Sequence, residues 1–393
     1  MILKVEYLRR ICRKYSPYAP KICFPYIGDT IGGSHFSSLT LYTALAENDF
    51  HPHIVLHKEG RLDELLKERH LDYELLPLEG YSSTEPSWSK RALKLASNTR
   101  VIRRYLAKTQ PDIVYTNDSR SHLEWTLASK LQNIPHIHHV RAKWSSYRYN
   151  NLLSQLTPYF VCVSDYVHGS CPNYVRRVAK TVHNPFKLQV NEDGLRPPEL
   201  LQTIGCLTPD TTIIGFVGNL LEQKRPEKFI EAAAKTAAKY DGPLAFVMLG
   251  DDRNGWWAEL EKRADVLGLQ SKLYYFGFQN PIESWISSFD ILLAPSVNEG
   301  WGRTLIEAML LGVPVVAPRS GGNMEIFKDG ETGLLCNPDD TEDMAEKVVS
   351  LLAYRAKAEA ISRNAQIWAA ETCSVEQHVQ KMQKIFCTAL PRV

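Results

Sequence analysis

The sequence SVNEGWGRTLIEAMLLGVPVVAPRSGGNME, from Ser296 to Glu325, decides the fold that we expect for this chain. A short apolar run precedes it at Ile291–Pro295, and a second one occupies Val313–Pro318. Runs of this length and composition are typical of buried parallel strands. Between them, Thr304–Leu311 has the spacing of an amphipathic helix. Strand, loop, helix and strand together predict a βαβ unit, and ligands of such units bind at the carboxyl ends of the strands.

Two carboxylates lie eight residues apart in this stretch, Glu299 on the loop and Glu307 on the helix. A carboxylate accepts hydrogen bonds from vicinal hydroxyls, so the pair suits a ligand with two sugar rings. Gly300 and Gly302 carry no side chains and let backbone N–H groups approach a ligand at a helix N-terminus. For a lone pair, a helix cap and a solvated helix face would be the simpler interpretation. The glycines and a second turn, Gly321–Glu325, favour a ligand site.

On these residues the chain resembles the family 4 glycosyltransferases, retaining enzymes of the GT-B fold that carry two glutamates separated by seven residues. The resemblance covers residues 20–390 and is strongest in the second half. It implies an α/β protein with two Rossmann-like domains, each on a doubly wound parallel sheet, facing each other across a cleft. It also implies that Glu299 contacts the donor sugar and Glu307 the ribose of the donor nucleotide.

Length and composition agree with a two-domain enzyme. A chain of 393 residues exceeds what one hydrophobic core usually supports. The net charge of +2 argues against binding nucleic acid by bulk electrostatics. We expect an N-terminal acceptor-side domain over residues 1–195 and a nucleotide-sugar-binding domain over residues 196–373. By the resemblance, residues 374–393 form a helix that crosses back to the first domain.

Cysteine spacing and hydropathy indicate a cytoplasmic protein. The eight cysteines form no CxxC pair and have no zinc-ligand spacing, so we expect buried reduced thiols. No apolar run approaches ~18 residues, so no transmembrane helix is expected. No apolar core of a signal peptide follows the first charges. Residues 1–21 carry six basic side chains and form either a basic amphipathic arm or an irregular terminus.

In the first half of the chain, short apolar runs alternate with helical segments, which predicts a parallel doubly wound sheet. The first run, Lys21–Ile27, leads through Gly32 and Gly33 into a helix. A Gly-Gly turn at a helix N-terminus can receive a phosphate, although a simple tight turn fits the same residues. In the family this pair often faces the donor phosphates. The turn lacks the dinucleotide fingerprint, which disfavours a nicotinamide cofactor.

Residues Trp88–Lys108 combine helical spacing of apolar residues with seven cations and no acid. A basic amphipathic helix is typical of a face for a membrane surface or an anionic acceptor. The alternative is a helix packed on the core with a solvated basic side. Each cation near an anionic leaflet contributes ~1 kcal/mol, so seven could hold the protein there reversibly. We favour peripheral contact with the inner face of the membrane.

The strand Pro135–Arg141 contains three histidines. His136 and His138 share one face, but no Cys or carboxylate cluster joins them, so a metal site is not expected. In the family, a histidine that contacts the donor sugar stands six residues after the proline. Arg141 holds that place here. Either Arg141 contacts acceptor or phosphate, or His139 takes over the role.

In the second half, the strand Thr211–Gly218 leads into a loop that contains Asn219 and Lys224. A lysine at this edge of a sheet can neutralise a diphosphate, although an ordinary surface lysine would have the same sequence. In the family the loop has an Arg and, five residues later, a Lys that together hold the donor diphosphate. Lys224 matches the lysine, Asn219 replaces the arginine, and Arg225 could compensate.

The resemblance implies transfer of a sugar from a nucleotide-diphosphate donor to a hydroxyl of a glycan or lipid-linked acceptor, with retention at the anomeric carbon. The basic segment Trp88–Lys108 favours a lipid-linked or anionic glycan acceptor, as in surface polysaccharide or glycolipid biosynthesis. The chain has no Asp-x-Asp motif, which agrees with a metal-independent donor site. The candidate catalytic residues are Glu299, Lys224, Arg141 and His139. The candidate donor-binding residues are Gly32, Gly33, Asn219, Gly277, Gly300, Trp301, Gly302, Thr304, Leu305 and Glu307.

Two alternatives stay open at this point. One is a nucleotide-sugar epimerase, or a hydrolytic relative, that uses the same fold. The other is a sugar-binding or scaffold subunit that has lost catalysis. The replacements at Asn219 and Arg141 support the scaffold, whereas the intact Glu299, Glu307 and Lys224 argue against it.

Overall fold

The computed structural model describes residues 19–48, 50–144, 148–187, 200, 210–252 and 254–390. The chain divides into two compact units. Unit 1 comprises residues 1–186 and 374–393, and unit 2 comprises residues 187–373. The predicted boundary between residues 195 and 196 and most of the basic segment 1–21 lie outside the described residues.

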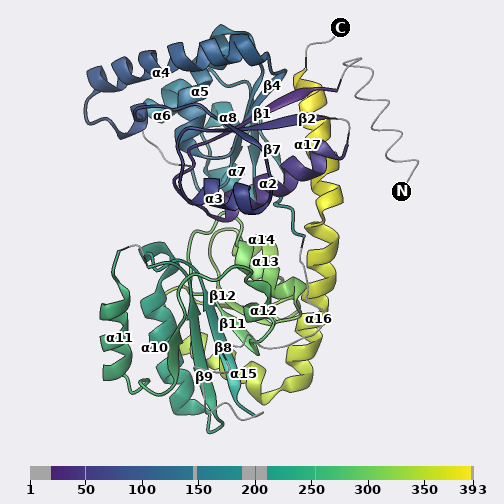
Figure 1. Ribbon diagram of the computed structural model, residues 1–393. Helices are drawn as coiled ribbons and strands as arrows, with labels where there is room; N and C mark the ends of the chain where they lie inside the picture. Colours follow the sequence, from purple (N-terminus) through teal and green to yellow (C-terminus); the bar gives the residue numbers. More distant parts are fainter. Residues whose placement is uncertain are drawn as a thin grey trace. The chain divides into compact units, whose positions relative to one another are not determined.

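Unit 1 is built on a parallel sheet with the strand order β3-β2-β1-β4-β5-β6-β7 (Figure 1). The strands are β1 Lys21–Tyr26, β2 His51–Leu56, β3 Tyr73–Leu75, β4 Ile113–Thr116, β5 His136–Val140, β6 Tyr159–Cys162 and β7 Lys180–Thr181. The helices are α2 Gly33–Ala46, α3 Arg61–Glu68, η1 Ser82–Thr84, α4 Trp88–Thr109, α5 Ser119–Leu131, α6 Arg148–Ser154, α7 Asp165–Ser170, α8 Asn173–Arg176 and α17 Val375–Ala389.

The last helix, α17, completes the core of unit 1. Met382 and Phe386 on its inner side are fully buried in the same cluster as Phe24 and Tyr115 of the sheet. The rings of Phe386 and Tyr115 meet edge to face, with centroids 5.5 Å apart. This burial of apolar side chains accounts for the grouping of residues 374–393 with unit 1, although they follow unit 2 in the chain.

Unit 2 is built on a second parallel sheet, with the order β10-β9-β8-β11-β12-β13 (Figure 1). The strands are β8 Thr212–Val217, β9 Leu244–Leu249, β10 Leu273–Tyr275, β11 Ile291–Leu293, β12 Val315–Pro318 and β13 Leu334–Cys336. The helices are η2 Glu222–Lys224, α10 Pro226–Lys239, α11 Trp257–Val266, α12 Glu283–Ile286, α13 Arg303–Leu310, α14 Asn323–Ile326, α15 Thr341–Ala353 and α16 Arg355–Thr372.

Both sheets are doubly wound. In unit 1 the strand order reverses between β1 and β4, and in unit 2 between β8 and β11. At such a reversal the two carboxyl-end loops run in opposite directions and leave a crevice where ligands bind. The prediction of two Rossmann-like domains on parallel sheets is therefore confirmed.

Five of the described cysteines are free and buried: Cys23, Cys162, Cys171, Cys336 and Cys373. Cys387 on α17 is buried as well, and the remaining two cysteines lie outside the described residues. None of the described helices combines the length and apolar character that crossing a lipid bilayer requires.

Three buried histidines form a cluster on one face of the unit 1 sheet. His136 and His138 both hydrogen-bond the Thr116 hydroxyl, at 2.9 and 3.2 Å. The ring of His122 stacks on His138 with centroids 3.8 Å apart, and its Nε2 bonds Ser154 Oγ at 3.0 Å. Burial lowers the pKa of His136 and of His138 to about 3, and burial with the neighbouring rings holds the pKa of His122 well below its usual value.

This cluster makes the stability of unit 1 depend on pH. Because the folded pKa values lie below those of an unfolded chain, near 6.5, the unfolded state binds more protons in acid. The stabilisation by each neutral histidine is complete above about pH 6.5 and falls by up to about 1.4 kcal/mol per pH unit below it. We predict that His122→Gln, which keeps a polar atom near Ser154, flattens the fall in unfolding free energy between pH 7 and pH 5.

The measurement is denaturant unfolding at a series of pH values. His51→Gln is the matched control, because His51 is exposed at the start of β2. The prediction is contradicted if the His122→Gln and His51→Gln proteins have the same pH dependence as the unsubstituted protein.

Candidate functional site

Three loops of unit 2 meet at the carboxyl edge of its sheet. They follow β8, β11 and β12, and β11 lies between the other two strands. Because parallel neighbouring strands end at the same edge, residues 218–225, 294–302 and 319–322 are brought together from distant parts of the sequence. The site forms at the strand reversal of this unit.

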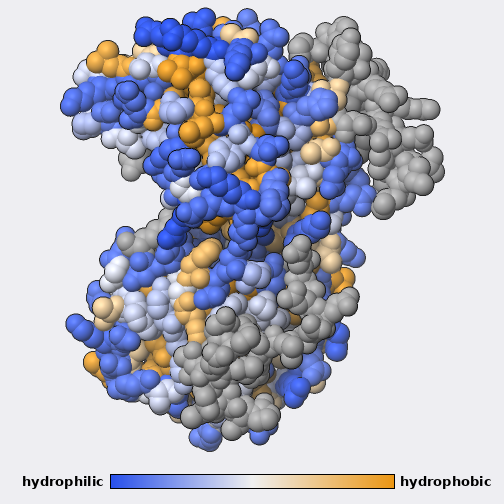
Figure 2. All heavy atoms as spheres, viewed as in Figure 1, coloured by the Kyte–Doolittle hydropathy of each residue, from blue (hydrophilic) through white to orange (hydrophobic). Residues whose placement is uncertain are grey.

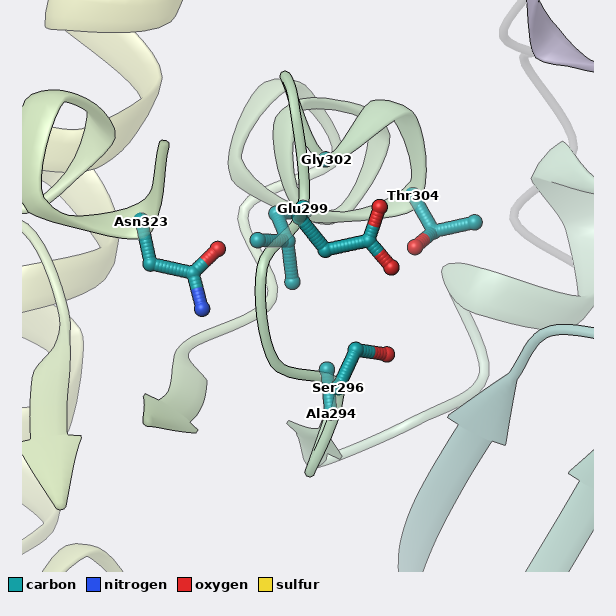
Figure 3. Close-up of a pocket in the computed structure, with 7 residues that line it drawn as sticks. Ala294, Ser296, Glu299, Gly302, Thr304 and Asn323 are labelled. Atoms are coloured by element: carbon teal, nitrogen blue, oxygen red, sulfur yellow. The ribbon is translucent and has the colours of Figure 1, made fainter. Parts of the chain in front are cut away.

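An ion pair joins the first two loops. Lys224 Nζ donates a hydrogen bond to Glu299 Oε1. The lysine side chain is 23% exposed and the carboxylate 19%, so both are accessible to a ligand but partly withdrawn from water. Figure 3 shows the carboxylate turned toward Thr304, at the start of α13. The structure therefore brings together two of the residues predicted from the sequence.

The Gly321-Gly322 turn allows the second and third loops to touch. Gly322 N donates to the backbone oxygen of Glu299 at 2.8 Å, and Asn298 N donates to Ser320 Oγ at 3.0 Å. A Cβ atom at Gly321 would lie 2.7 Å from the Glu299 oxygen, closer than real contacts permit. Gly321 also has a φ of +59°, which favours glycine. These glycines fix the position of the Glu299 backbone.

Glu307 on α13 is buried and paired. Its side chain is 7% exposed, and Arg303 Nε, one turn earlier on the helix, lies 2.8 Å from its Oε1. Burial raises the pKa of Glu307, and the positive charge of Arg303 opposes that shift. The interpretation of Glu307 as part of a solvated helix face is therefore wrong. Arg303 was not predicted, although the i, i+4 spacing could have indicated the pair.

The N-terminus of α13 carries no side-chain cap. Gly302 holds the N-cap position, where a Cβ would lie 2.8 Å from Leu305 Cγ. The backbone N–H groups of the first turn are thus available to an anionic ligand. Trp301 is placed differently from its neighbours, because its indole is 5% exposed and packs against Trp368 of α16 with centroids 6.3 Å apart. Its side chain contributes packing.

A small pocket lies among these loops (Figure 3). Three of the lining residues, Gly302, Thr304 and Leu305, were predicted, together with Glu299. Ser296 and Asn323 were not predicted. The complete lining is Ala294, Ser296, Glu299, Gly302, Thr304, Leu305 and Asn323.

The loop after β8 offers one cation, Lys224, to the site, because Asn219 and Arg225 have other partners. Asn219 Oδ1 accepts a hydrogen bond from Asp251 N at 3.2 Å, so this side chain braces the neighbouring loop. Arg225 donates to the Pro338 oxygen at 2.5 Å and to Asp339 Oδ1 at 2.6 Å. The guanidinium is held at the loop before α15, and the idea that Arg225 replaces the missing family arginine finds no support in this arrangement.

Gly277 lies on the same carboxyl edge, after β10. Its φ is +67°, and its carbonyl accepts a hydrogen bond from Gly250 N at 2.8 Å. Two adjacent strand ends are thereby tied together, which gives the turn after β10 a fixed backbone.

In unit 1, Arg141 stands at the carboxyl end of β5. Its guanidinium donates to Asn184 Oδ1, to Asn117 Oδ1 at 2.8 Å and to Tyr115 Oη at 3.4 Å. These partners are neutral, and they orient the cation at the edge of the sheet. Gly32 is the N-cap of α2, which has no side-chain cap, and Gly33 begins that helix.

His139 is placed in the interior of unit 1. It has no exposed surface, its Nδ1 bonds Tyr115 Oη at 2.7 Å, and its ring lies parallel to His378 of α17 at 6.3 Å between centroids. A donor sugar could not reach the ring in this arrangement. Of the two residues predicted for this role, Arg141 is accessible and His139 is not. Among the described residues, no group of three or more His, Cys, Asp or Glu side chains is arranged to hold a metal.

Both halves of the sequence match glycosyltransferase families. Residues 207–368 match the family described as Glycosyl transferases group 1, and residues 31–187 match Glycosyltransferase Family 4. The uncharacterized glycosyltransferase MJ1607 of Methanocaldococcus jannaschii is 32% identical over 184 residues, 46% of each chain. The lipopolysaccharide core biosynthesis mannosyltransferase LpsB of Rhizobium meliloti is 28% identical over 194 residues, 46% of this chain and 52% of LpsB. The matches span about half the length of these curated relatives.

The fold is that of solved GT-B glycosyltransferases. The structure of HepE from Anabaena in complex with UDP and glucose superposes with a TM-score of 0.79. The superposition covers 94% of this chain and 100% of HepE, at 20% sequence identity. At that identity the likeness establishes the architecture, two Rossmann-like α/β domains of the GT-B type.

Proposed function

We propose that this protein is a retaining glycosyltransferase that moves a sugar from a nucleotide-diphosphate donor to a hydroxyl of a glycan or lipid-linked acceptor. The observation that carries the proposal is the pairing of Lys224 with Glu299 beside the uncapped N-terminus of α13. This arrangement offers positive charge to a diphosphate and a carboxylate to sugar hydroxyls. The name of LpsB supports a setting in surface polysaccharide or glycolipid biosynthesis.

Charge is the main demand of the proposed reaction. The leaving diphosphate becomes more anionic as the anomeric carbon becomes oxocarbenium-like. Lys224 and the backbone N–H groups at Thr304 and Leu305 would stabilise the diphosphate without a metal ion. Glu299 would orient the sugar ring through its hydroxyls. For retention, an oxygen of the leaving group takes the proton from the acceptor hydroxyl on the same face, so no protein base is required.

Glu307 has a separate role in this proposal. An ionised carboxylate can accept hydrogen bonds from both hydroxyls of a ribose. Burial favours the neutral form of Glu307, and Arg303 favours the ionised form. Arg303 therefore supports nucleoside binding by keeping its neighbour charged. In unit 1, Arg141 would offer a fixed cation to an acceptor group or a phosphate.

The first test is thermal unfolding of the purified protein with nucleoside diphosphates and nucleotide sugars, with and without EDTA. Ligand at ~100 times its dissociation constant stabilises by ~2.7 kcal/mol and raises the unfolding midpoint by a few degrees. We predict a shift with one diphosphonucleoside that EDTA does not change and that Glu307→Ala abolishes. Glu331→Ala, at an exposed position of unit 2, should keep the shift.

If no nucleotide shifts the midpoint, the donor site is contradicted and the scaffold alternative gains support. Once a donor is identified, the anomeric configuration of the product, read from its NMR coupling constants, tests retention. An inverted product would contradict the proposed mechanism.

A second part of the proposal concerns α4. This helix buries Leu95, Ile102 and Leu106 in the core of unit 1, and its cations lie on the opposite, outer side. Its outer side also exposes Trp88 by 57% and Leu93 by 72%. Figure 2 shows mainly hydrophilic side chains over this edge, interrupted by apolar ones. Exposed cations beside exposed apolar side chains suit an anionic bilayer surface, and we propose peripheral membrane contact here.

Co-sedimentation with vesicles tests this contact. We predict binding to phosphatidylcholine vesicles that contain phosphatidylglycerol, weaker binding as salt rises, and little binding to phosphatidylcholine alone. Reversal of three exposed cations of α4, Lys90→Glu, Arg100→Glu and Arg104→Glu, should abolish it. The matched control reverses three exposed lysines elsewhere, Lys262→Glu, Lys357→Glu and Lys384→Glu. Equal binding by the two triple variants would contradict the proposal.

A further inference from the structure

Asn323 at the start of α14 occupies one wall of the pocket, and the proposed function gives it no role. It is 1% exposed, and its backbone N–H donates to the Ser320 oxygen at 3.2 Å. Figure 3 shows its side chain entering the pocket from the α14 side, across from the loop that carries Glu299.

The orientation of the Asn323 amide is determined by its surroundings. Nδ2 lies 3.0 Å from the Pro318 oxygen. A backbone carbonyl can only accept a hydrogen bond, so the NH₂ group faces Pro318. Figure 3 shows the amide oxygen on the side of the loop that carries Glu299. Oδ1 is buried and has no hydrogen-bond partner among the described residues. Leaving a buried acceptor without a donor costs about 1–3 kcal/mol of free energy, so a ligand group that donates a hydrogen bond to Oδ1 would bind there favourably.

The rest of the lining indicates the chemistry of that ligand. Glu299 is an acceptor, and Ser296 and Thr304 carry hydroxyls that can donate or accept. Ala294 and Leu305 make the remaining surface apolar. Phosphate oxygens bring no donor at neutral pH, so they would leave Asn323 Oδ1 unpaired. A hydroxyl of a sugar satisfies it, because its proton can be donated to Oδ1 while its oxygen accepts from a neighbour.

Asn323 follows directly after the backbone contact that joins its loop to the Glu299 loop. The hydrogen bond from Gly322 N to the Glu299 oxygen joins the two loops directly before Asn323. This contact links the backbones on both sides of the pocket, and selection among sugar hydroxyls requires polar groups held in place on both sides.

We propose that Asn323 is a specificity-determining residue whose Oδ1 accepts a hydrogen bond from one hydroxyl of the transferred sugar, a hydroxyl different from those that Glu299 binds. This inference rests on the proposed function, because it assigns part of the same donor site. A donor that lacks that hydroxyl leaves the buried oxygen unpaired and is rejected.

The test compares dissociation constants of three kinds of probe by titration calorimetry: the nucleoside diphosphate, the nucleotide sugar, and nucleotide sugars that lack one hydroxyl each. We predict that Asn323→Ala binds the diphosphate within about twofold of the unsubstituted protein and the nucleotide sugar about tenfold or more weakly. One deoxy donor, which lacks the hydroxyl that Asn323 binds, should bind the unsubstituted protein as weakly as the complete nucleotide sugar binds Asn323→Ala. Its affinity should not fall further in Asn323→Ala. The other deoxy donors should lose about tenfold in the variant.

Asn323→Asp guards against a purely structural effect. A protonated carboxyl can donate to the Pro318 oxygen and keep an acceptor toward the pocket, so this variant should recover selectivity as pH falls. Asn337→Ala, at an exposed asparagine, is the matched control and should leave all affinities unchanged.

The proposal is overturned if Asn323→Ala binds the nucleotide sugar like the unsubstituted protein, or if every deoxy donor loses affinity equally in both proteins. It is also overturned if diphosphate affinity falls together with sugar affinity, since that result marks Asn323 as a structural residue. Failure of the unsubstituted protein to bind any diphosphate would instead reject the proposed function itself, and the inference with it.

Discussion

The ion pair between Lys224 and Glu299 is the interaction on which the candidate site depends. The strand order of unit 2 puts the two loops at one edge, and the pair joins their side chains there. A nearby cation favours the ionised form of a buried carboxylate, and Glu307 has such a cation in Arg303. A nucleotide sugar carries a diphosphate and several hydroxyls. Its diphosphate could replace Glu299 as the partner of Lys224, and its hydroxyls could donate hydrogen bonds to both carboxylates. The site is charged and pre-arranged, with each charge compensated.

Backbone geometry sets the precision of this arrangement. Gly321 and Gly322 let the loop after β12 approach the loop after β11 so closely that a side chain would not fit. Gly302 serves the same purpose at the start of α13, against Leu305. At Gly322 the missing side chain lets the backbone N–H reach the Glu299 oxygen of the neighbouring loop. At Gly321 and Gly322 the neighbouring atoms are backbone atoms of the loop after β11, so a Cβ atom could not be accommodated there without moving that loop.

Sequence periodicity predicted the parallel sheet of the first half and a βαβ unit in the second, because short apolar runs between helices allow few other structures. The family resemblance supplied the second sheet. The alternation along β5 also placed His136 and His138 on one face, where both reach Thr116. Features that depend on distant contacts could not be predicted. The indole of Trp301 packs on Trp368, and His139 lies against His378 of α17, a helix at the far end of the sequence. The direction of the Asn323 amide depends on the carbonyl of Pro318, which the sequence cannot reveal.

The most direct test of this account is a double-mutant cycle on diphosphate affinity with Lys224→Met, Glu299→Gln and the combined variant. If the diphosphate takes over the lysine, Lys224→Met should weaken its binding about tenfold or more. Glu299→Gln should leave it unchanged or tighter, because the competing carboxylate is gone, and the combined variant should resemble Lys224→Met alone. Equal losses in the two single variants, or unchanged affinity in Lys224→Met, would contradict the central claim that Lys224 of this ion pair binds the donor diphosphate.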